Sequence, residues 1–219
     1  MCHSQINNSM NHAQELSLHT VRHNKHKLGN RSLHLELWHT PDHSVTWLPI
    51  PKNGYSVVKE VVSLNNWQMS YWHGDSQIQG LSFCIIRNPI TRLFTGLREF
   101  YSRTEDPVLG VLNWPDMLDA FFQEPQLFDE HCEPQCFYLH GFRPSRWIRY
   151  NSMASNLAQW KQFPANKIIN QQSANTSKAG NLWNLYCKYQ QQANRILASH
   201  WQCDMDLWNN PLGEVDNLL

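Results

Sequence analysis

The stretch WLPIPKNGYSVVKEVV, residues 47–62, begins as an apolar strand and ends as the apolar face of a helix. Between the two lie a lysine, a glycine and a hydroxyl residue, Lys52, Gly54 and Ser56. A glycine lets the backbone approach an anion closely, and the first amide groups of a helix point out of its N-terminus. Lys52 adds a positive charge and Ser56 a hydroxyl donor. The turn therefore predicts a phosphate site, with an ordinary strand-to-helix turn as the alternative.

The stretch CIIRNPITRLFTGLREFYS, residues 84–102, repeats this arrangement. An apolar strand runs into an amphipathic helix that begins at Pro89. Arg87 lies at the end of the strand, and Thr95 follows it by eight residues. An arginine beside the N-terminus of a helix suits a second phosphate. Arg92, one turn into the helix, is either a further phosphate contact or an arginine that faces solvent or forms a salt bridge. Together the two stretches predict a site for a nucleotide that carries phosphate at two separate positions.

Strands and helices alternate along the rest of the chain. Apolar runs and apolar–polar alternation predict strands at 33–37, 45–50, 81–87, 146–150 and 166–170. Apolar residues at helical spacing predict helices at 57–62, 90–101, 113–122, 155–163 and 182–197. This alternation predicts an α/β fold of three layers, P-loop-like, with a mainly parallel central sheet flanked by helices. Residues 1–30 are polar and histidine-rich and predict a peripheral arm, which leaves 31–219 as a single domain.

The overall charge excludes several classes of partner. Lysine plus arginine and aspartate plus glutamate number 18 each, so the net charge is zero. Such a chain has no global field to attract nucleic acid or an anionic membrane, and any anion site must be local. No window approaches the roughly 18 apolar residues of a membrane helix, and the N-terminus does not resemble a signal peptide. With scattered cysteines, these features predict a cytoplasmic protein without a transmembrane segment or a nucleic-acid partner.

With its two motifs in this order, the sequence resembles the sulfotransferases that use 3'-phosphoadenosine 5'-phosphosulfate (PAPS), especially their carbohydrate and membrane-associated branch. Their 5'-phosphosulfate loop reads approximately P-K-x-[GA]-x-[ST], which is PKNGYS here. Their 3'-phosphate motif reads approximately R-[DN]-P-x-x-R-x-x-S, which is RNPITRLFT here, with Thr95 in place of the serine. The resemblance covers about residues 44–208.

Two further blocks add to the resemblance and also depart from the family pattern. DEHCEPQCFYLHGF, residues 129–142, resembles the family's HW-x-PQ segment, with Cys132 in place of the tryptophan. WIRYNSMASNL, residues 147–157, resembles a unit that often reads R-x-E-N-L, with Asn151 in place of the acid. The role of that acid is therefore lost here.

The resemblance implies a role for each motif. Lys52 and the Ser56 hydroxyl would hold the 5'-phosphosulfate of PAPS, and Lys52 would offset the charge that builds on the bridging oxygen as the sulfuryl group leaves. Arg87 and Thr95 would hold the 3'-phosphate. The backbone that would surround the 5'-phosphosulfate belongs to Asn53, Gly54, Tyr55, Ser56 and Val57.

The acceptor and its base are less closely defined. In-line transfer to a hydroxyl or amine needs a general base, and there are two candidate histidines. His73 precedes the strand of the second motif, and His131 lies in the HCEPQ segment. The balanced charge favours a glycan, a glycolipid or a small hydroxylated metabolite as the acceptor. Transfer that relies on lysine, arginine and backbone amides needs no metal.

Three alternatives compete with this interpretation. The departures at Thr95, Cys132 and Asn151 suit a non-catalytic nucleotide-binding module with a degenerate sulfotransferase fold. A zinc site is possible because His131, Cys132, Cys136 and His140 lie within one short segment. An ATP or GTP phosphotransferase is disfavoured, because the lysine of the first turn precedes its glycine, unlike the G-x-x-x-x-G-K-[ST] loop.

Overall fold

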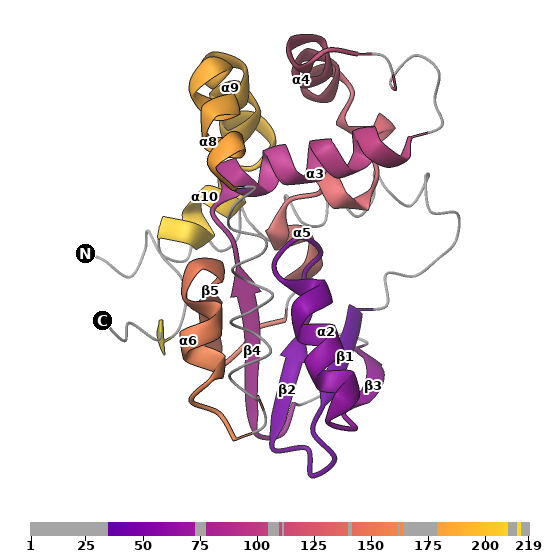
Figure 1. Ribbon diagram of the computed structural model, residues 1–219, viewed down its shortest axis with the longest axis vertical. Helices are drawn as coiled ribbons and strands as arrows, with labels where there is room; N and C mark the ends of the chain where they lie inside the picture. Colours follow the sequence, from indigo (N-terminus) through magenta and orange to yellow (C-terminus); the bar gives the residue numbers. More distant parts are fainter. Residues whose placement is uncertain are drawn as a thin grey trace, which may run out of the picture.

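The computed structural model describes residues 35–72, 78–104, 110, 112–139, 142–161, 163, 179–209 and 214–215. The predicted arm at 1–30 and the predicted strand at 166–170 lie outside these residues. The described part is a mixed sheet flanked by helices, with a group of helices above one end of the strands (Figure 1). The predicted α/β class is confirmed.

The sheet has six strands in the order β3-β1-β2-β4-β5-β6. Their bounds are Leu35–His39 for β1, Val45–Leu48 for β2, Gln68–Trp72 for β3, Leu81–Ile86 for β4, Arg146–Arg149 for β5 and Glu214–Val215 for β6. Strands β2, β4, β5 and β6 are parallel neighbours. Strand β1 is antiparallel to both β2 and β3.

The sheet is therefore mixed, and the prediction of a mainly parallel sheet holds only for its β2–β4–β5–β6 side. A turn of a few residues joins β1 to β2, and so short a connection forces neighbouring strands to run antiparallel. Strand β3 was not predicted from the sequence, because its residues are largely exposed and form no apolar run.

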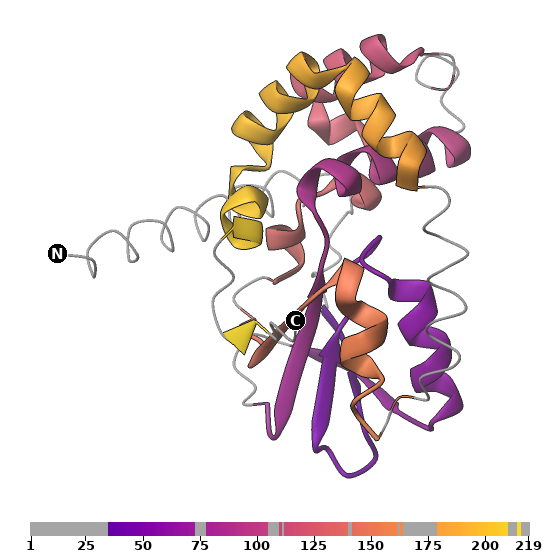
Figure 2. The same cartoon turned by 60° about the vertical axis from the view of Figure 1, so that its left-hand side comes forward.

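Side chains that alternate along the central strands fill two separate cores. Trp47, Phe83 and Ile148 face one side of the sheet, where they pack with α2 (Tyr55–Leu64) and α6 (Met153–Leu157). Leu48 and Cys84 face the other side, with α5 (Gln135–Leu139) and α10 (Gln202–Asn209). Figure 2 shows α2 and α6 on one side of the sheet and α10 on the other. This arrangement has the three layers that were predicted.

A third core lies among helices only. It joins α3 (Pro89–Arg103), α4 (Trp114–Gln123), α8 (Ala179–Lys188) and α9 (Gln190–His200). The long C-terminal helix predicted at 182–197 is thus two helices, α8 and α9, separated at Tyr189. Three short 3-10 helices complete the described elements: η2 (Pro125–Leu127), η3 (Glu130–Cys132) and η4 (Tyr150–Ser152).

Two helices begin as their sequences predict. The Asn88 side chain accepts a hydrogen bond from the Ile90 amide at 3.0 Å, and Pro89 takes the first position of α3. Asn113 caps α4 through the Asp116 amide at 3.1 Å. Both are favoured N-cap arrangements. Among the described helices, none combines the length and the apolarity that crossing a membrane requires.

Candidate functional site

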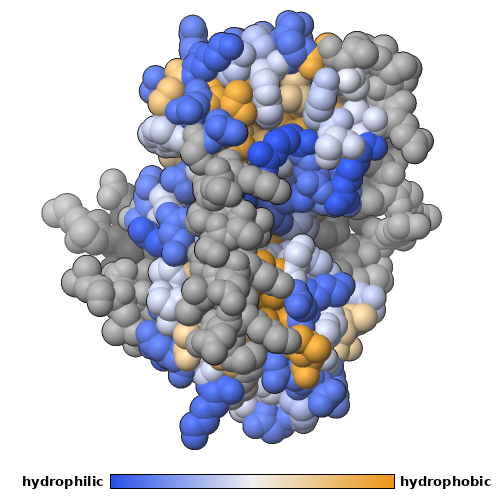
Figure 3. Space-filling model, viewed as in Figure 1, coloured by the Kyte–Doolittle hydropathy of each residue, from blue (hydrophilic) through white to orange (hydrophobic). Residues whose placement is uncertain are grey.

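A cavity of about 400 Å³ lies where β2 and β4 end and α2 and α3 begin. All the residues assigned above to the nucleotide, except Asn53, line it, and so does His131. Figure 3 shows hydrophilic side chains gathered at the level of α3, between the upper helices and the sheet. The full lining consists of Pro51, Lys52, Gly54, Tyr55, Ser56, Val57, Arg87, Thr95, Arg98, Arg103, His131 and Tyr150.

This cavity is strongly cationic although the whole chain is neutral. Four of its lining residues carry positive charge, and none of the described lining residues is a carboxylic acid: the cations are Lys52, Arg87, Arg98 and Arg103. Converging charges beside two helix N-termini raise the local concentration of anions. The cavity therefore has the local positive charge that an anion site in a neutral chain would need.

The turn after β2 has an unusual backbone that presents the start of α2 to the cavity. Lys52 and Gly54 both adopt positive φ angles, of 68° and 87°. A side chain at Gly54 would be crowded as well as strained, because a Cβ would lie 2.7 Å from the Met153 sulfur. Gly54 is the N-cap of α2, and no side chain caps this helix. Its first amide groups are therefore suitable donors for an anion.

Lys52 forms an ion pair with a carboxylate from α3. Its Nζ lies 3.0 Å from Glu99 Oε2, and Glu99 also pairs with Arg103 one turn further along the helix. Partial burial alone would raise the pKa of Glu99, but the hydrogen bond and charge of Lys52, with the charges of Arg103 and His131, lower it. Glu99 is consequently an anion that already neutralises part of the cationic cavity.

Arg87 connects the second motif to the first. Its Nη1 donates a hydrogen bond to the Lys52 carbonyl at 3.0 Å, and its guanidinium lies 4.6 Å from the centre of the Tyr150 ring. Burial, and then the positive charges of Arg92 and Arg98, lower the pKa of Arg87 although Tyr150 acts to raise it. Its buried Nε has no hydrogen-bond partner within the described residues. A buried donor without a partner is costly, and the Nε atoms of Arg92 and Arg149 are unpartnered in the same way among the described residues.

Two other residues of the second motif differ from the simplest expectation. The Thr95 hydroxyl donates to the Thr91 carbonyl at 2.6 Å, so it must rotate before it can donate to a phosphate oxygen. Arg92 is neither solvent-facing nor a cavity residue: it is fully buried and donates to the carbonyls of Glu133 and Pro51. It therefore supports the two loops and does not contact the ligand cavity.

His131 is the candidate base that the structure places at the cavity. Its Nδ1 lies 3.0 Å from Asp129 Oδ2, so a base at this position would act through the other ring nitrogen. Burial alone would raise the pKa of Asp129, but hydrogen bonds from His131 and the charge of its ring lower it. Gly96 of α3 makes room for this segment, since a Cβ there would collide with the His131 carbonyl. His73, the other candidate, lies outside the described residues.

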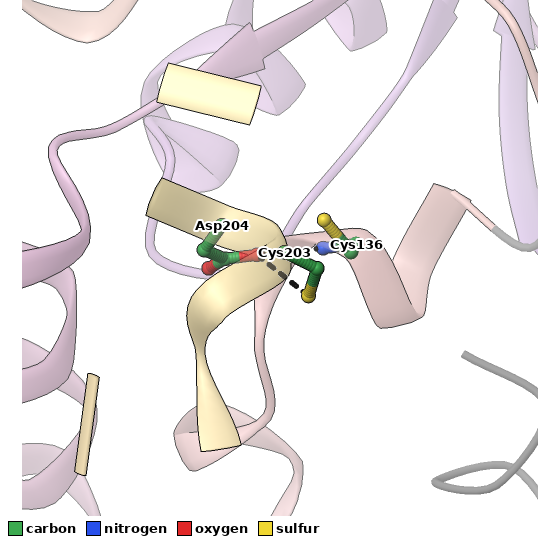
Figure 4. Close-up of side chains that lie close together, drawn as sticks. All are labelled: Cys136, Cys203 and Asp204. Atoms are coloured by element: carbon green, nitrogen blue, oxygen red, sulfur yellow. Dashed lines mark hydrogen bonds between the residues drawn. The ribbon is translucent and has the colours of Figure 1, made fainter. Parts of the chain in front are cut away.

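Among the described residues, the predicted zinc ligands do not gather into one group. His131 lies with Asp129 and Glu130, whereas Cys136 lies with Cys203 and Asp204 (Figure 4). His140 is outside the described residues. Both oxygens of Asp204 already accept backbone hydrogen bonds, from the amides of Gln135 at 2.7 Å and Cys136 at 2.9 Å. The buried Asp204 therefore caps α5, which accounts for it without a metal ion.

A second cavity, of about 360 Å³, lies at the opposite end of the sheet beside β1 and β3. Its polar groups include His39, whose two ring nitrogens already contact Thr46 Oγ1 at 2.9 Å and Ser70 Oγ at 2.6 Å. No lysine or arginine lines it among the described residues. It contains none of the residues that the sequence singled out.

Three cavity residues were not identified from the sequence. Arg98 and Arg103 follow Thr95 on α3, and Tyr150 follows β5. Helical spacing from Thr95 could have indicated Arg98, because residues three apart share a helix face. The position of Tyr150 depends on how β5 pairs with β4, which no local pattern gives.

Comparisons of the chain with family models, with curated proteins and with solved structures found no match.

Proposed function

We propose that the protein is a PAPS-dependent sulfotransferase with a P-loop-like nucleotide site. One observation carries the proposal: two motifs, selected separately in the sequence as phosphate sites, line the same cationic cavity. Lys52 and the start of α2 form one site, and Arg87 and Thr95 form the other. A nucleotide with two separated phosphate groups fits such a pair, because Lys52 and Arg87 each bring positive charge to the cavity.

The proposed chemistry is direct transfer of the sulfuryl group. An acceptor oxygen attacks the sulfur, the bond between sulfur and the bridging phosphate oxygen breaks, and the nucleotide leaves as 3'-phosphoadenosine 5'-phosphate. Lys52 offsets the charge that develops on the leaving oxygen. His131, oriented by Asp129, takes the proton of the acceptor hydroxyl. The acceptor is a glycan, a glycolipid or a small hydroxylated metabolite.

The function is tested first by nucleotide selectivity. Calorimetry is expected to show that 3'-phosphoadenosine 5'-phosphate binds much more tightly than AMP or ATP, because it alone occupies both phosphate sites. Each charged phosphate contact contributes about 1.5–3 kcal/mol, which is roughly 10- to 150-fold in affinity. Equal affinities for AMP and the bisphosphate would remove Arg87 from its proposed role and contradict the proposal.

A non-catalytic nucleotide-binding module is the second candidate. The observation that favours it is the Lys52–Glu99 ion pair, which neutralises the lysine that an enzyme would need. Radiolabelled PAPS with a panel of hydroxylated acceptors separates the two. An enzyme transfers label to at least one acceptor, and a variant with Lys52→Met then loses turnover far more than affinity. A binding module loses affinity only.

A further inference from the structure

Gln135 joins the two phosphate-binding turns through one side-chain amide. Its Oε1 accepts hydrogen bonds from the Arg87 backbone amide at 2.7 Å and from Asn53 Nδ2 at 2.6 Å. Its Nε2 donates to the Arg87 carbonyl at 3.0 Å. The side chain is fully buried and does not line the cavity. It therefore contacts the backbone of one motif and the side chain of the other without reaching the ligand.

Asn53 links Gln135 to the backbone of the first turn, between Lys52 and Gly54. Its backbone was predicted to contact the nucleotide, and its side chain is buried and lines neither of the two cavities described above. Its Nδ2 donates to the Ile85 carbonyl at 2.8 Å as well as to Gln135. The side chain between Lys52 and Gly54 is thus tied to β4, directly and through Gln135. The lysine turn cannot shift relative to Arg87 without breaking these hydrogen bonds.

The position of Gln135 is itself fixed from another part of the chain. Asp204 of α10 accepts hydrogen bonds from the amides of Gln135 and Cys136, at the start of α5. Figure 4 shows Asp204 beside Cys136 and Cys203 at this junction. Gln135 is consequently held on its backbone side by α10 and on its side-chain side by both turns.

We propose that Gln135 is a positioning residue that sets the distance between the two phosphate sites and so selects nucleotides phosphorylated at two positions. The inference rests on the proposed nucleotide function. A ligand held at two points gains from the second contact only when the sites match its span. An amide suits the task because Arg87 offers Gln135 both an N–H and a carbonyl, so the side chain must accept and donate at once.

The test compares two ligands in variants of the full chain. Gln135→Met keeps the length of the side chain but removes its hydrogen bonds. Calorimetry is expected to show that affinity for 3'-phosphoadenosine 5'-phosphate falls at least about tenfold, whereas affinity for AMP changes less than about threefold. Each phosphate site remains, and only the match between them is lost. Asn156→Leu is the matched control, because Asn156 is a buried amide that bonds to Ser152 and to neither turn.

Two further variants keep the inference testable if Gln135→Met does not fold, which circular dichroism would show. Gln135→Glu still accepts hydrogen bonds but cannot donate to the Arg87 carbonyl, and it is expected to reduce the ratio of the two affinities by a smaller factor. Asn53→Ala removes the other partner. The double variant Asn53→Ala with Gln135→Glu is expected to lose less selectivity than the two single variants combined, because the hydrogen bond between Asn53 and Gln135 is counted in both single losses.

The outcomes separate this inference from the function beneath it. A wild-type protein that binds AMP and the bisphosphate equally would overturn the proposed function, and the inference with it. A wild-type preference that survives unchanged in the Gln135 variants would overturn the inference alone. Equal losses for both ligands would also overturn it, because they would show that Gln135 supports the fold and not the spacing.

Discussion

At the scale of single residues, the cavity shows which of its side chains could be identified from the sequence alone. Lys52, Gly54, Arg87 and Thr95 were identified because a phosphate needs a charge, a hydroxyl or a close backbone, and sequence displays these locally. Glu99 was not identified, because its role depends on α3 lying across the end of β2, so that its carboxylate reaches Lys52 at 3.0 Å. Contacts between distant segments have no local signal.

Glu99 competes with any anion that binds beside Lys52. Glu99→Gln is therefore expected to raise the affinity for 3'-phosphoadenosine 5'-phosphate, by up to about fivefold for a partly exposed pair. Calorimetry measures the change, and Glu60→Gln, an exposed acid on α2 that does not line the cavity, is the control. A weaker affinity in the Glu99 variant would show that Glu99 orients Lys52 for the ligand.

The identity of the base is a second matter for single residues. His131→Ala is expected to lower turnover by about 10²–10⁴-fold, the usual contribution of a general base, while affinity for the bisphosphate product changes little. His73→Ala is measured in parallel, because the structure places His131 at the cavity and does not describe His73. Full turnover in the His131 variant with none in the His73 variant would assign the base to His73.

At the scale of elements, the two strand–turn–helix units could be predicted, but strand β3 and the 3-10 helix η3 beside the cavity could not. Each unit has an apolar strand, a helix with apolar residues at regular spacing and a recognisable start, such as Asn88 followed by Pro89. Strand β3 lacks these features, because most of its residues are exposed. The 3-10 helix η3 carries His131 to the cavity through contact with α3, which depends on tertiary packing.

Gly96 is the residue of α3 that permits this contact. Gly96→Ala would place a Cβ against the His131 carbonyl, so η3 must move away from the helix. We expect the free energy of unfolding to fall by about 1–3 kcal/mol, even though alanine favours a helix more than glycine does. The midpoint temperature of thermal unfolding and the turnover rate are both measured, and both are expected to be lower than in the wild type.

Gly110→Ala is the matched control for this substitution. The nearest atom to a Cβ at Gly110 is Thr104 Cγ2, at an ordinary contact distance of 3.6 Å. Its stability is expected to stay near that of the wild type. If the Gly96 and Gly110 variants unfold at the same temperature and turn over equally, then the contact between α3 and η3 does not position His131.

At the scale of the whole molecule, the α/β fold class could be predicted from the sequence, but the order and directions of the strands in the sheet could not. Alternating strands and helices indicate an α/β protein, and the cores on both faces of the sheet agree with that pattern. The antiparallel side of the sheet consists of the pairs that β1 forms with β2 and β3. The pairing of β1 with β3 joins segments that are distant in the sequence, so no local pattern indicates it. The helical core of α3, α4, α8 and α9 brings together segments that no motif connects.

The cap that Asp204 provides for α5 also has a consequence for the order in which the protein acquires its site. Both phosphate motifs are translated well before α10, and 68 residues separate Cys136 from Asp204. Domains begin to fold while the ribosome is still adding residues. A nascent chain that ends before α10 has made both turns, but it lacks the carboxylate that holds Gln135 between them. The proposed nucleotide site is therefore completed only after α10 has been synthesised, although no residue of this helix lines the cavity.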